Sequence, residues 1–466
     1  MLYDKLKSYS QSGVYPFHMP GHKRHFYNEK LPYELDITEI DGFDNLQNPS
    51  GCIKAVEDKA ARLYDVKKAF ISVNGSTGGV LAAVRSMTKR GDHVLVARNC
   101  HASVYHAIEL LGLKPEYILP EYYEKCDLYA WVSAKQIENK LEEYGDISLV
   151  ILTSPTYEGV CSDIKAIAKV CRNNGAKLFI DEAHGAHFPF SESFPQEAVK
   201  AGADAAVVSL HKTLPSMTQT ALLLTDSEEL SQKLKSNLAF FQTSSPSYIL
   251  MASVEMCLDY IETNKSEFEI YTENLNRFYN SAESLSRLKL LNKYDFDFGF
   301  DLGKLVITTK NTNLSGVELA KILRKKYKLE IEMSSLNYVI AMTSVCDNRS
   351  GFDRLIKALL EIDSNCLTAK EISSPCFKPS VPEQSFSPCR AENFSSSTIK
   401  LDYAENKASL EYIWAYPPGI PLIVPGEIIS CETILLIKNL INGGVSVYSS
   451  QNNLKNNLCV SVVEFD

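Results

Sequence analysis

Lys212 is the side chain with the clearest chemical potential in this sequence. It stands in Ser209-Leu-His-Lys-Thr213, directly after the apolar run of residues 205–208. A lysine at the end of a buried strand, where the chain enters a polar turn, is well placed to have a depressed pKa and to form a Schiff base. Most loop lysines are only solvated, so this interpretation depends on companions elsewhere in the chain.

The first companion is a glycine-rich turn, Val73-Asn-Gly-Ser-Thr-Gly-Gly79, between a strand-like run and a helical stretch that begins at Val80. Glycines allow close approach of the backbone, and hydroxyls together with the N–H groups of a helix start can cradle a phosphate. An ordinary turn explains this motif alone equally well. The sequence lacks the G-x-x-x-x-G-K-[ST] pattern, which argues against a P-loop nucleotide.

The second companion is Asp181, which ends the apolar run of Phe179-Ile-Asp-Glu-Ala-His184. An aspartate there can pair with a protonated heterocyclic nitrogen and keep it charged, as an electron sink built on pyridine requires. A helicase-type Asp-Glu-Ala-His box that binds Mg²⁺ beside a nucleotide is the competing interpretation. That interpretation needs a P-loop upstream, and the chain has none.

The third companion is His101, in Arg98-Asn-Cys-His after the apolar run of residues 93–97. An imidazole at a strand end can stack on a flat cofactor ring, although a lone histidine is more often structural. The chain order of glycine-rich loop, histidine, aspartate and lysine is what favours a functional site over four unrelated turns.

The elements around these residues predict an α/β fold. At about 150 residues per domain, 466 residues suggest two or three domains. Between residues 53 and 250, short apolar runs such as 148–153, 177–180 and 205–209 alternate with amphipathic stretches such as 163–173. This alternation is typical of βα units with a mostly parallel sheet, whose functional residues gather past the carboxyl ends of the strands.

The rest of the chain predicts smaller parts. We expect a large domain over residues 1–260, which includes an N-terminal segment, and an α+β lobe over 261–365 with helices at 268–290 and 319–327. A stretch rich in Ser and Pro over 366–400 is typical of a linker, and a compact C-terminal domain follows over 401–466.

Composition excludes several classes of protein. Hydrophobic residues make up 45% and charged residues 23%, which is ordinary for a globular protein. The 48 basic and 57 acidic residues give a net charge of −9, which argues against nucleic acid as a main partner. The first residues lack a signal-peptide core, and no run reaches the roughly 18 apolar residues of a membrane span, so we expect a cytosolic protein. The 12 cysteines show no Cys-x-x-Cys pair, which gives no support for a metal site.

Beyond these features, the sequence resembles a known family, the prokaryotic ornithine/lysine/arginine decarboxylases. These are pyridoxal-phosphate enzymes of fold type I, and the likeness is greatest to the short form without an N-terminal wing domain. The stretches that carry the resemblance are Phe17-His-Met-Pro-Gly-His-Lys23, Asp36-Ile-Thr-Glu39, Asn74-Gly-Ser-Thr77, Arg98-Asn-Cys-His101, Pro155-Thr-Tyr-Glu-Gly159, Asp181-Glu-Ala-His-Gly-Ala-His-Phe188, Ser209-Leu-His-Lys-Thr213, Thr218-Gln219, Tyr416-Pro-Pro-Gly-Ile-Pro-Leu422 and Pro425-Gly-Glu427. Two departures are Ala102, where a lysine is common, and the segment 406–411, which lacks a glycine often found there.

The resemblance implies a role for each motif. Lys212 would form the Schiff base with pyridoxal 5'-phosphate, His101 would stack on its ring, and Asp181 would pair with the ring nitrogen. His184 would lie nearby, and the phosphate or its surroundings would involve Ser76, Thr77, Gly78, Ser209 and His211. Similar enzymes are dimers with sites at the subunit interface, so we expect at least a homodimer.

The substrate implied is a basic amino acid, and the reaction would belong to polyamine biosynthesis. The resemblance favours arginine, giving agmatine, over lysine, giving cadaverine, or ornithine, giving putrescine. A distal cation needs acidic partners, for which Glu427 is the candidate, with Asp41 and Asp44 behind it; a solvated carboxylate explains each equally well. Lys212 or His211 could return a proton to Cα after loss of CO₂.

Other functions compete with decarboxylation. An aminotransferase or a β-eliminating lyase would use the same cofactor site. A nucleotide-dependent protein of the Asp-Glu-Ala-His type would depend on residues 181–184 alone, and a catalytically inactive cofactor-binding protein is the remaining alternative.

Overall fold

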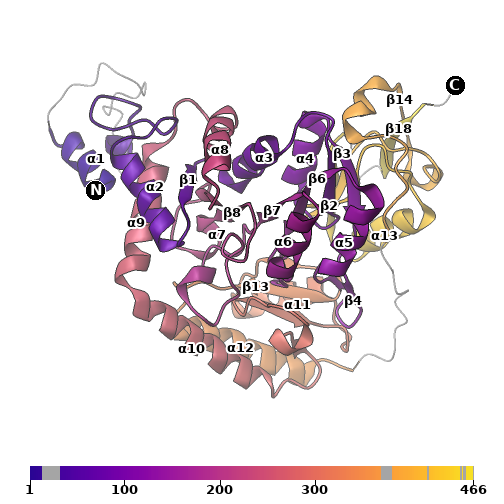
Figure 1. The fold of residues 1–466 in the computed structure, drawn as a ribbon. Helices are drawn as coiled ribbons and strands as arrows, with labels where there is room; N and C mark the ends of the chain where they lie inside the picture. Colours follow the sequence, from indigo (N-terminus) through magenta and orange to yellow (C-terminus); the bar gives the residue numbers. More distant parts are fainter. Residues whose placement is uncertain (13–31, 369–379, 417–418, 452–453, 455–457, 465–466) are drawn as a thin grey trace. The chain divides into compact units, whose positions relative to one another are not determined.

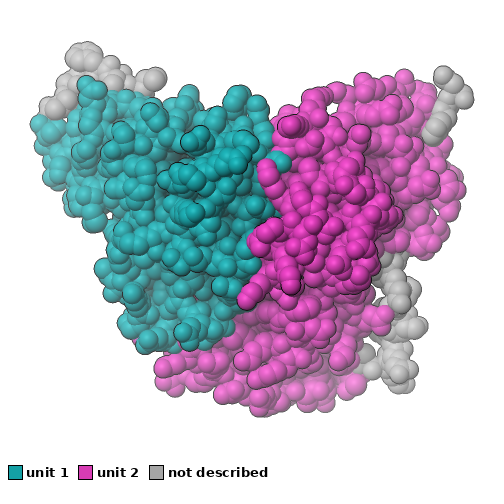
Figure 2. Space-filling view, in the orientation of Figure 1, with its two compact units in different colours: residues 1–87, 178–269 teal, residues 88–177, 270–466 magenta. Residues whose placement is uncertain are grey.

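The computed structural model describes residues 1–12, 32–368, 380–416, 419–451, 454 and 458–464 (Figure 1). The resembling stretch at residues 17–23 and the two prolines at 417–418 lie outside the described residues, as does part of the expected linker. The chain divides into two compact units, coloured separately in Figure 2: unit 1 comprises residues 1–87 and 178–269, and unit 2 comprises 88–177 and 270–466.

Unit 1 is built on strands in the order β1-β9-β8-β7. β7 and β8 run parallel, whereas β9 is antiparallel to β8 and to β1. All residues of β8 and β9 are buried, as continuous apolar runs predict for strands covered on both faces. The bounds are β1 (Lys68–Ser72), β7 (Lys177–Asp181), β8 (Ala205–Ser209) and β9 (Ala221–Thr225).

Helices cover this sheet, and one of them lies unusually close to it. A Cβ on Gly79 of α3 would stand 2.6 Å from Cγ2 of Val207 on β8, so only glycine fits at this crossing. The helices of unit 1 are α1 (Leu2–Ser10), α2 (Cys52–Leu63), α3 (Gly75–Met87), α7 (Leu210–Thr213), α8 (Glu228–Phe240) and α9 (Tyr248–Thr263), with short 3₁₀ turns at Tyr33–Leu35 and Phe188–Phe190; α10 (Lys265–Ala282) begins here and continues in unit 2.

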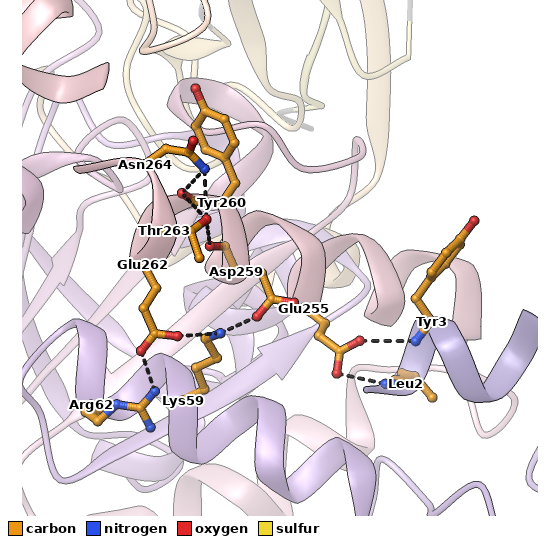
Figure 3. A network of polar contacts seen from close by, with 10 residues as sticks. All are labelled: Leu2, Tyr3, Lys59, Arg62, Glu255, Asp259, Tyr260, Glu262, Thr263 and Asn264. Carbon is orange, nitrogen blue, oxygen red and sulfur yellow. Dashed lines mark hydrogen bonds and ion pairs between the residues drawn. The ribbon is translucent and has the colours of Figure 1, made fainter. Parts of the chain in front are cut away.

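Two groups of polar contacts connect α1 and α2 to α9 (Figure 3). Glu255 of α9 is buried and accepts hydrogen bonds from the backbone N–H groups of Leu2 and Tyr3, at 2.8 and 3.1 Å, which satisfies the start of α1. Lys59 of α2 forms ion pairs with Asp259 and Glu262 of α9. α1 and α2 thus join the same unit as the strands that carry the site.

Unit 2 contains three parallel strands in the order β6-β2-β3, with β2 parallel to both neighbours. The elements of this part are β2 (His93–Ala97), α4 (Ala102–Leu111), β3 (Lys114–Ile118), the hairpin β4 (Tyr122–Tyr123) and β5 (Leu128–Tyr129), α5 (Ala134–Tyr144), β6 (Ile147–Thr153) and α6 (Ile164–Asn173). Ser133 and Asp163 cap α5 and α6 with their side chains, as helix starts require.

The lobe of unit 2 is an antiparallel sheet in the order β10-β11-β13-β12, and its apolar core also includes Leu128 of β5 and Val160. Its elements are β10 (Lys289–Leu290), a 3₁₀ turn (Lys293–Asp295), β11 (Lys304–Thr308), α11 (Gly316–Ile322), a π-helical turn (Leu323–Tyr327), β12 (Met333–Ser334), β13 (Tyr338–Met342) and α12 (Arg349–Asn365).

The C-terminal elements, orange to yellow in Figure 1, enclose a further core. β14 pairs with β18, and β15 lies between β16 and β17. The bounds are a 3₁₀ turn (Pro388–Asn393), β14 (Ser396–Lys400), a 3₁₀ turn (Leu401–Tyr403), β15 (Ile413–Tyr416), β16 (Ile420–Ile423), α13 (Cys431–Asn442), β17 (Ser446–Ser449) and β18 (Cys459–Val463). β14 is formed by the last residues of the segment expected as a linker.

The predicted α/β class is confirmed, because the apolar runs at 148–153, 177–180 and 205–209 form β6, β7 and β8. One expected helix differs: α10 ends at Ala282 instead of continuing to residue 290. Asp363 accepts the N–H groups of Ser286, Arg287 and Leu288, which turns the chain into β10. Within the described parts of the chain, no helix is long and apolar enough to cross a membrane.

Candidate active site

Lys212 and His184 contact each other at the carboxyl ends of two parallel neighbours, β8 and β7. Nζ of Lys212 lies 2.9 Å from Nε2 of His184. His184 is buried and Lys212 is half-buried. Because the partner is an imidazole rather than a carboxylate, the contact does not require the amine to be charged. A lysine that can become neutral is the form that attacks a carbonyl.

Asp181 is the last residue of β7 and only 4% exposed. Its Oδ1 accepts a hydrogen bond from the N–H of Ala183 at 3.2 Å, which fixes the carboxylate at the start of the turn that leads to His184. Asp181 lies opposite Val207 of β8, two residues before that strand ends. Asp181 and Lys212, both predicted from the sequence, therefore lie at the carboxyl ends of neighbouring parallel strands of unit 1.

The glycine-rich turn links β1 to α3. Gly75 has a φ of +68°, and its N–H donates to the carbonyl of Gln219 at 2.8 Å. The hydroxyl of Ser72 donates to the carbonyl of Gly75 at 2.8 Å. The helix therefore begins at Gly75, five residues before the expected start, and Ser76, Thr77 and Gly78 form its first turn. The N–H groups of that turn are an anion-binding feature.

Ser209 ends β8 and is fully buried, yet its hydroxyl has no hydrogen-bond partner among the described residues. Across the sheet, Ser209 lies opposite Ala221, which itself lies opposite Ser72. The hydroxyl of Ser209 is thus at the same end of the sheet as the glycine-rich turn. A hydroxyl and helix N–H groups at one edge fit a phosphate supplied by a bound cofactor.

His211 donates from Nδ1 to the carbonyl of Thr220 at 3.0 Å. Burial is the largest influence on this side chain and lowers its pKa, and the neighbouring Lys212 lowers it further. The hydrogen bond fixes the orientation of the ring and leaves Nε2 as its basic atom when the imidazole is neutral.

His101 belongs to unit 2, where it precedes α4 and is exposed. Its Nδ1 accepts from the N–H of Ser103 at 3.2 Å, so the histidine caps the helix start. The ring therefore has a fixed place at the end of β2.

The three acidic substrate candidates have different surroundings. Glu427, in unit 2, is 1% exposed and accepts from Nη2 of Arg98 at 3.0 Å and from the N–H of Val424 at 2.8 Å. In unit 1, Asp44 accepts several backbone N–H groups before and at the start of α2, which lower its pKa although burial alone would raise it. Asp41 is exposed. A role of these residues toward a substrate stays a prediction.

Sequence reasoning missed the residues that act through backbone carbonyls, Gln219 and Thr220. The first accepts from Gly75 and the second from His211. A carbonyl carries no signal in residue type, and the only hint was the Thr218-Gln219 pair in the resemblance.

The strand ends define the class of the protein. Along the chain, a helix start follows β1, an aspartate ends β7 and a lysine follows β8. This is the order found in fold type I enzymes. The fold is similar to that of a lysine decarboxylase from Francisella novicida, with a TM-score of 0.84 and 19% identity over 99% of this chain and 81% of that one.

The family follows from the sequence. The model of the Orn/Lys/Arg decarboxylase major domain matches residues 1–297, and that of the family's C-terminal domain matches 371–441. The chain belongs to this family. It is 29% identical to the arginine decarboxylase of Bacillus subtilis over 96% of this chain and 94% of that protein. It is also 31% identical to the uncharacterized protein YaaO of the same organism, over 99% and 98% of the two chains. It is a pyridoxal-phosphate-dependent amino-acid decarboxylase.

Proposed function

We propose that the protein decarboxylates arginine to agmatine in polyamine biosynthesis. The supporting observation for the chemistry is the Lys212–His184 contact beside Asp181. The supporting observation for the substrate is how much of the chain is similar to an arginine decarboxylase. The match to the Bacillus subtilis arginine decarboxylase spans 96% of this chain, whereas the match to the Pseudomonas aeruginosa lysine decarboxylase LdcA, at 25% identity, spans 54% of it.

The proposed roles follow from the atoms that each residue presents. Pyridoxal phosphate, when bound, supplies an aldehyde and a ring that withdraws electrons from Cα. Lys212 would hold the aldehyde, with His184 orienting its amine. Asp181 would hold a proton on the ring nitrogen, and His101 would stack on the ring. The phosphate would be bound by Ser76, Thr77, Gly78, Ser209 and His211.

The chain offers two groups for the proton that Cα must receive. Lys212 is an amine whose contact is an imidazole, and His211 is a neighbouring imidazole whose lowered pKa makes it a poor holder of a proton. Lys212 is therefore the favoured donor in this proposal.

The proposal extends to the substrate's cation. Glu427, Asp41 and Asp44 are the acidic candidates, and amide variants of each separate them. Replacing the carboxylate that binds the guanidinium should raise KM for arginine with little change in kcat. The reason is that this interaction is the same in the ground and transition states.

The proposed assembly is at least a homodimer, and the proposed location is the cytoplasm. The family resemblance supports the dimer. Sedimentation equilibrium of the purified protein tests the dimer, which a monomer mass at micromolar concentration would contradict.

The substrate is tested by incubating the purified protein and pyridoxal phosphate with equal amounts of arginine, lysine and ornithine. Mass spectrometry then identifies the amines that form, and we expect agmatine to dominate. Cadaverine or putrescine as the main product would overturn the arginine assignment. No amine from a yellow protein would contradict decarboxylation and favour an aminotransferase or a lyase.

A further inference from the structure

β1 leads directly into the glycine-rich turn, and it is the terminal strand of its sheet. Its partner β9 satisfies one edge, so the N–H and C=O groups at the other edge need other partners. Alternate residues direct their backbone groups to the same edge. Ile71 and Val73 therefore share the outer edge, just before the turn.

Two side chains replace the missing neighbour strand at this edge. Glu57 of α2 accepts from the N–H of Ile71 at 3.2 Å. Gln242, two residues after the end of α8, accepts from the N–H of Val73 at 2.8 Å and donates to the carbonyl of Ile71 at 3.4 Å. A carboxamide carries one acceptor and a donor, so Gln242 pairs with β1 as a peptide group of a strand would.

The residue before Gln242 also contacts the turn. The carbonyl of Phe241 accepts from Nδ2 of Asn74 at 2.9 Å. It also lies 3.4 Å from the position that a Cβ on Gly78 would occupy. Residues 241 and 242 thus contact the turn just before the start of α3, and the carbonyl of Phe241 lies near Gly78 in the first turn of that helix.

We propose that Gln242 is a positioning residue for the phosphate cradle of residues 74–78. Its hydrogen bonds continue the pairing of β1 past Ser72, the last residue of the strand. They thereby fix the backbone at Val73 and Asn74, which directly precede the first turn of α3. Gln242 acts through the backbone of Ile71 and Val73 rather than on the cofactor. The inference rests on the proposed cofactor site and adds a residue to it that none of the resembling motifs contains.

The test replaces Gln242 by methionine, which keeps the length of the side chain and removes both hydrogen bonds. The dissociation constant of pyridoxal phosphate is measured by titrating apoenzyme and following the visible absorbance. We expect it to rise about tenfold or more, since two hydrogen bonds that order the cradle are lost. With saturating cofactor, kcat and KM for arginine should stay within about twofold, because the reacting atoms are untouched.

Gln136 provides a matched control in unit 2. Its amide also accepts from one backbone N–H, that of Ser133 at 2.8 Å, and donates to one backbone carbonyl, that of Leu119 at 3.1 Å; it accepts in addition from the Ser133 hydroxyl at 3.0 Å. Gln136→Met loses the same kinds of bond, and it should lower the melting temperature of apoenzyme without changing the cofactor's dissociation constant.

Asn74→Ala is the second variant, for the case in which Gln242→Met does not fold. It removes the contact to Phe241 and should weaken cofactor binding about threefold. In either variant, an unchanged dissociation constant with a lowered melting temperature would overturn the proposal and leave a purely structural role. Failure of the wild-type protein to bind pyridoxal phosphate would instead contradict the cofactor site itself.

Discussion

Lys212 after β8 in unit 1 and Arg98 after β2 in unit 2 are both basic residues that follow strands, but their partners differ in kind. Lys212 contacts an imidazole. Arg98 donates to Glu427, to the carbonyls of Pro421 and Leu422 and to the hydroxyl of Tyr105, and its guanidinium lies 5.5 Å from the ring centroids of Tyr105 and Tyr117. The first arrangement tolerates loss of a proton, and the second fixes a permanent charge.

The difference shows why burial alone does not mark a catalytic base. Burial disfavours the charge on Arg98, but Glu427 and the two tyrosines outweigh it and raise the pKa of the guanidinium. Such a group anchors the C-terminal elements to the end of β2 and cannot act as a nucleophile. Lys212 has a partner that can itself gain or lose a proton, which is the arrangement that chemistry needs.

Lys212→Ala tests the reactive side of this comparison and should have the largest effect. Without the amine, the visible absorbance of the bound cofactor should disappear, and kcat/KM should fall by more than about a thousandfold. Absorbance spectra and amine production measure both. Lys233→Ala, an exposed lysine of α8 in the same unit, is the control and should change neither. An unchanged spectrum for Lys212→Ala would refute its assignment.

Asp181→Asn separates cofactor binding from activity. The amide keeps the size of the side chain but cannot hold a charged ring nitrogen, so kcat should fall about a hundredfold or more while the protein stays yellow. Cofactor content and kcat are measured on the same preparation. Turnover near that of the wild type would remove the electron-sink role of Asp181.

Arg98→Met tests the structural side of the comparison. Removing one member of a buried ion pair leaves Glu427 without its cation, which should cost about 3–5 kcal/mol in the free energy of unfolding. Arg98→Met/Glu427→Leu should recover a large part of that loss. Urea denaturation measures both, with the exposed Arg62→Met as control. If the single and double variants are equally unstable, the ion pair is not the source of the loss.

Glu57 can be compared with Glu427, because both are buried carboxylates. The partner of Glu57 is a backbone N–H, whereas that of Glu427 is a guanidinium. Burial raises the pKa of Glu57 from 4.5 to about 7. Between these values the unfolded chain loses its proton first, so the free energy of unfolding falls as the pH rises. The fall from this group reaches about 3 kcal/mol above pH 7.

Glu57→Gln should remove this pH dependence and make the protein more stable than the wild type at pH 8. Denaturation curves between pH 5 and pH 8 check the sign. Parallel stability profiles for the variant and the wild type would contradict a raised pKa of Glu57.

The sequence was sufficient where a feature is local. Apolar runs predicted β6, β7 and β8, and the polar residues that follow two of them, Asp181 and Lys212, were recognised from that position. The start of α3 at Gly75 was not predicted, because it depends on contacts of the turn such as the hydrogen bond from the Ser72 hydroxyl to the carbonyl of Gly75.

Long-range partners could not be predicted from the pattern. Arg98 and Glu427 are 329 residues apart, and Val73 and Gln242 are 169 apart. Neither pair has a periodicity or a spacing that would connect its members. Glu427 was predicted as a substrate carboxylate from its charge and its place in the Pro425-Gly-Glu427 turn, and its guanidinium partner was not foreseen.

Lys212 of unit 1 is the residue that we expect to hold the cofactor. Borohydride treatment of the yellow enzyme, followed by proteolysis and mass spectrometry, would locate the lysine to which pyridoxal phosphate becomes fixed. We expect the modified peptide to contain Lys212 in stoichiometric amount. Modification of another lysine, with Lys212 recovered unmodified, would contradict the assignment of the active site to the ends of β7 and β8.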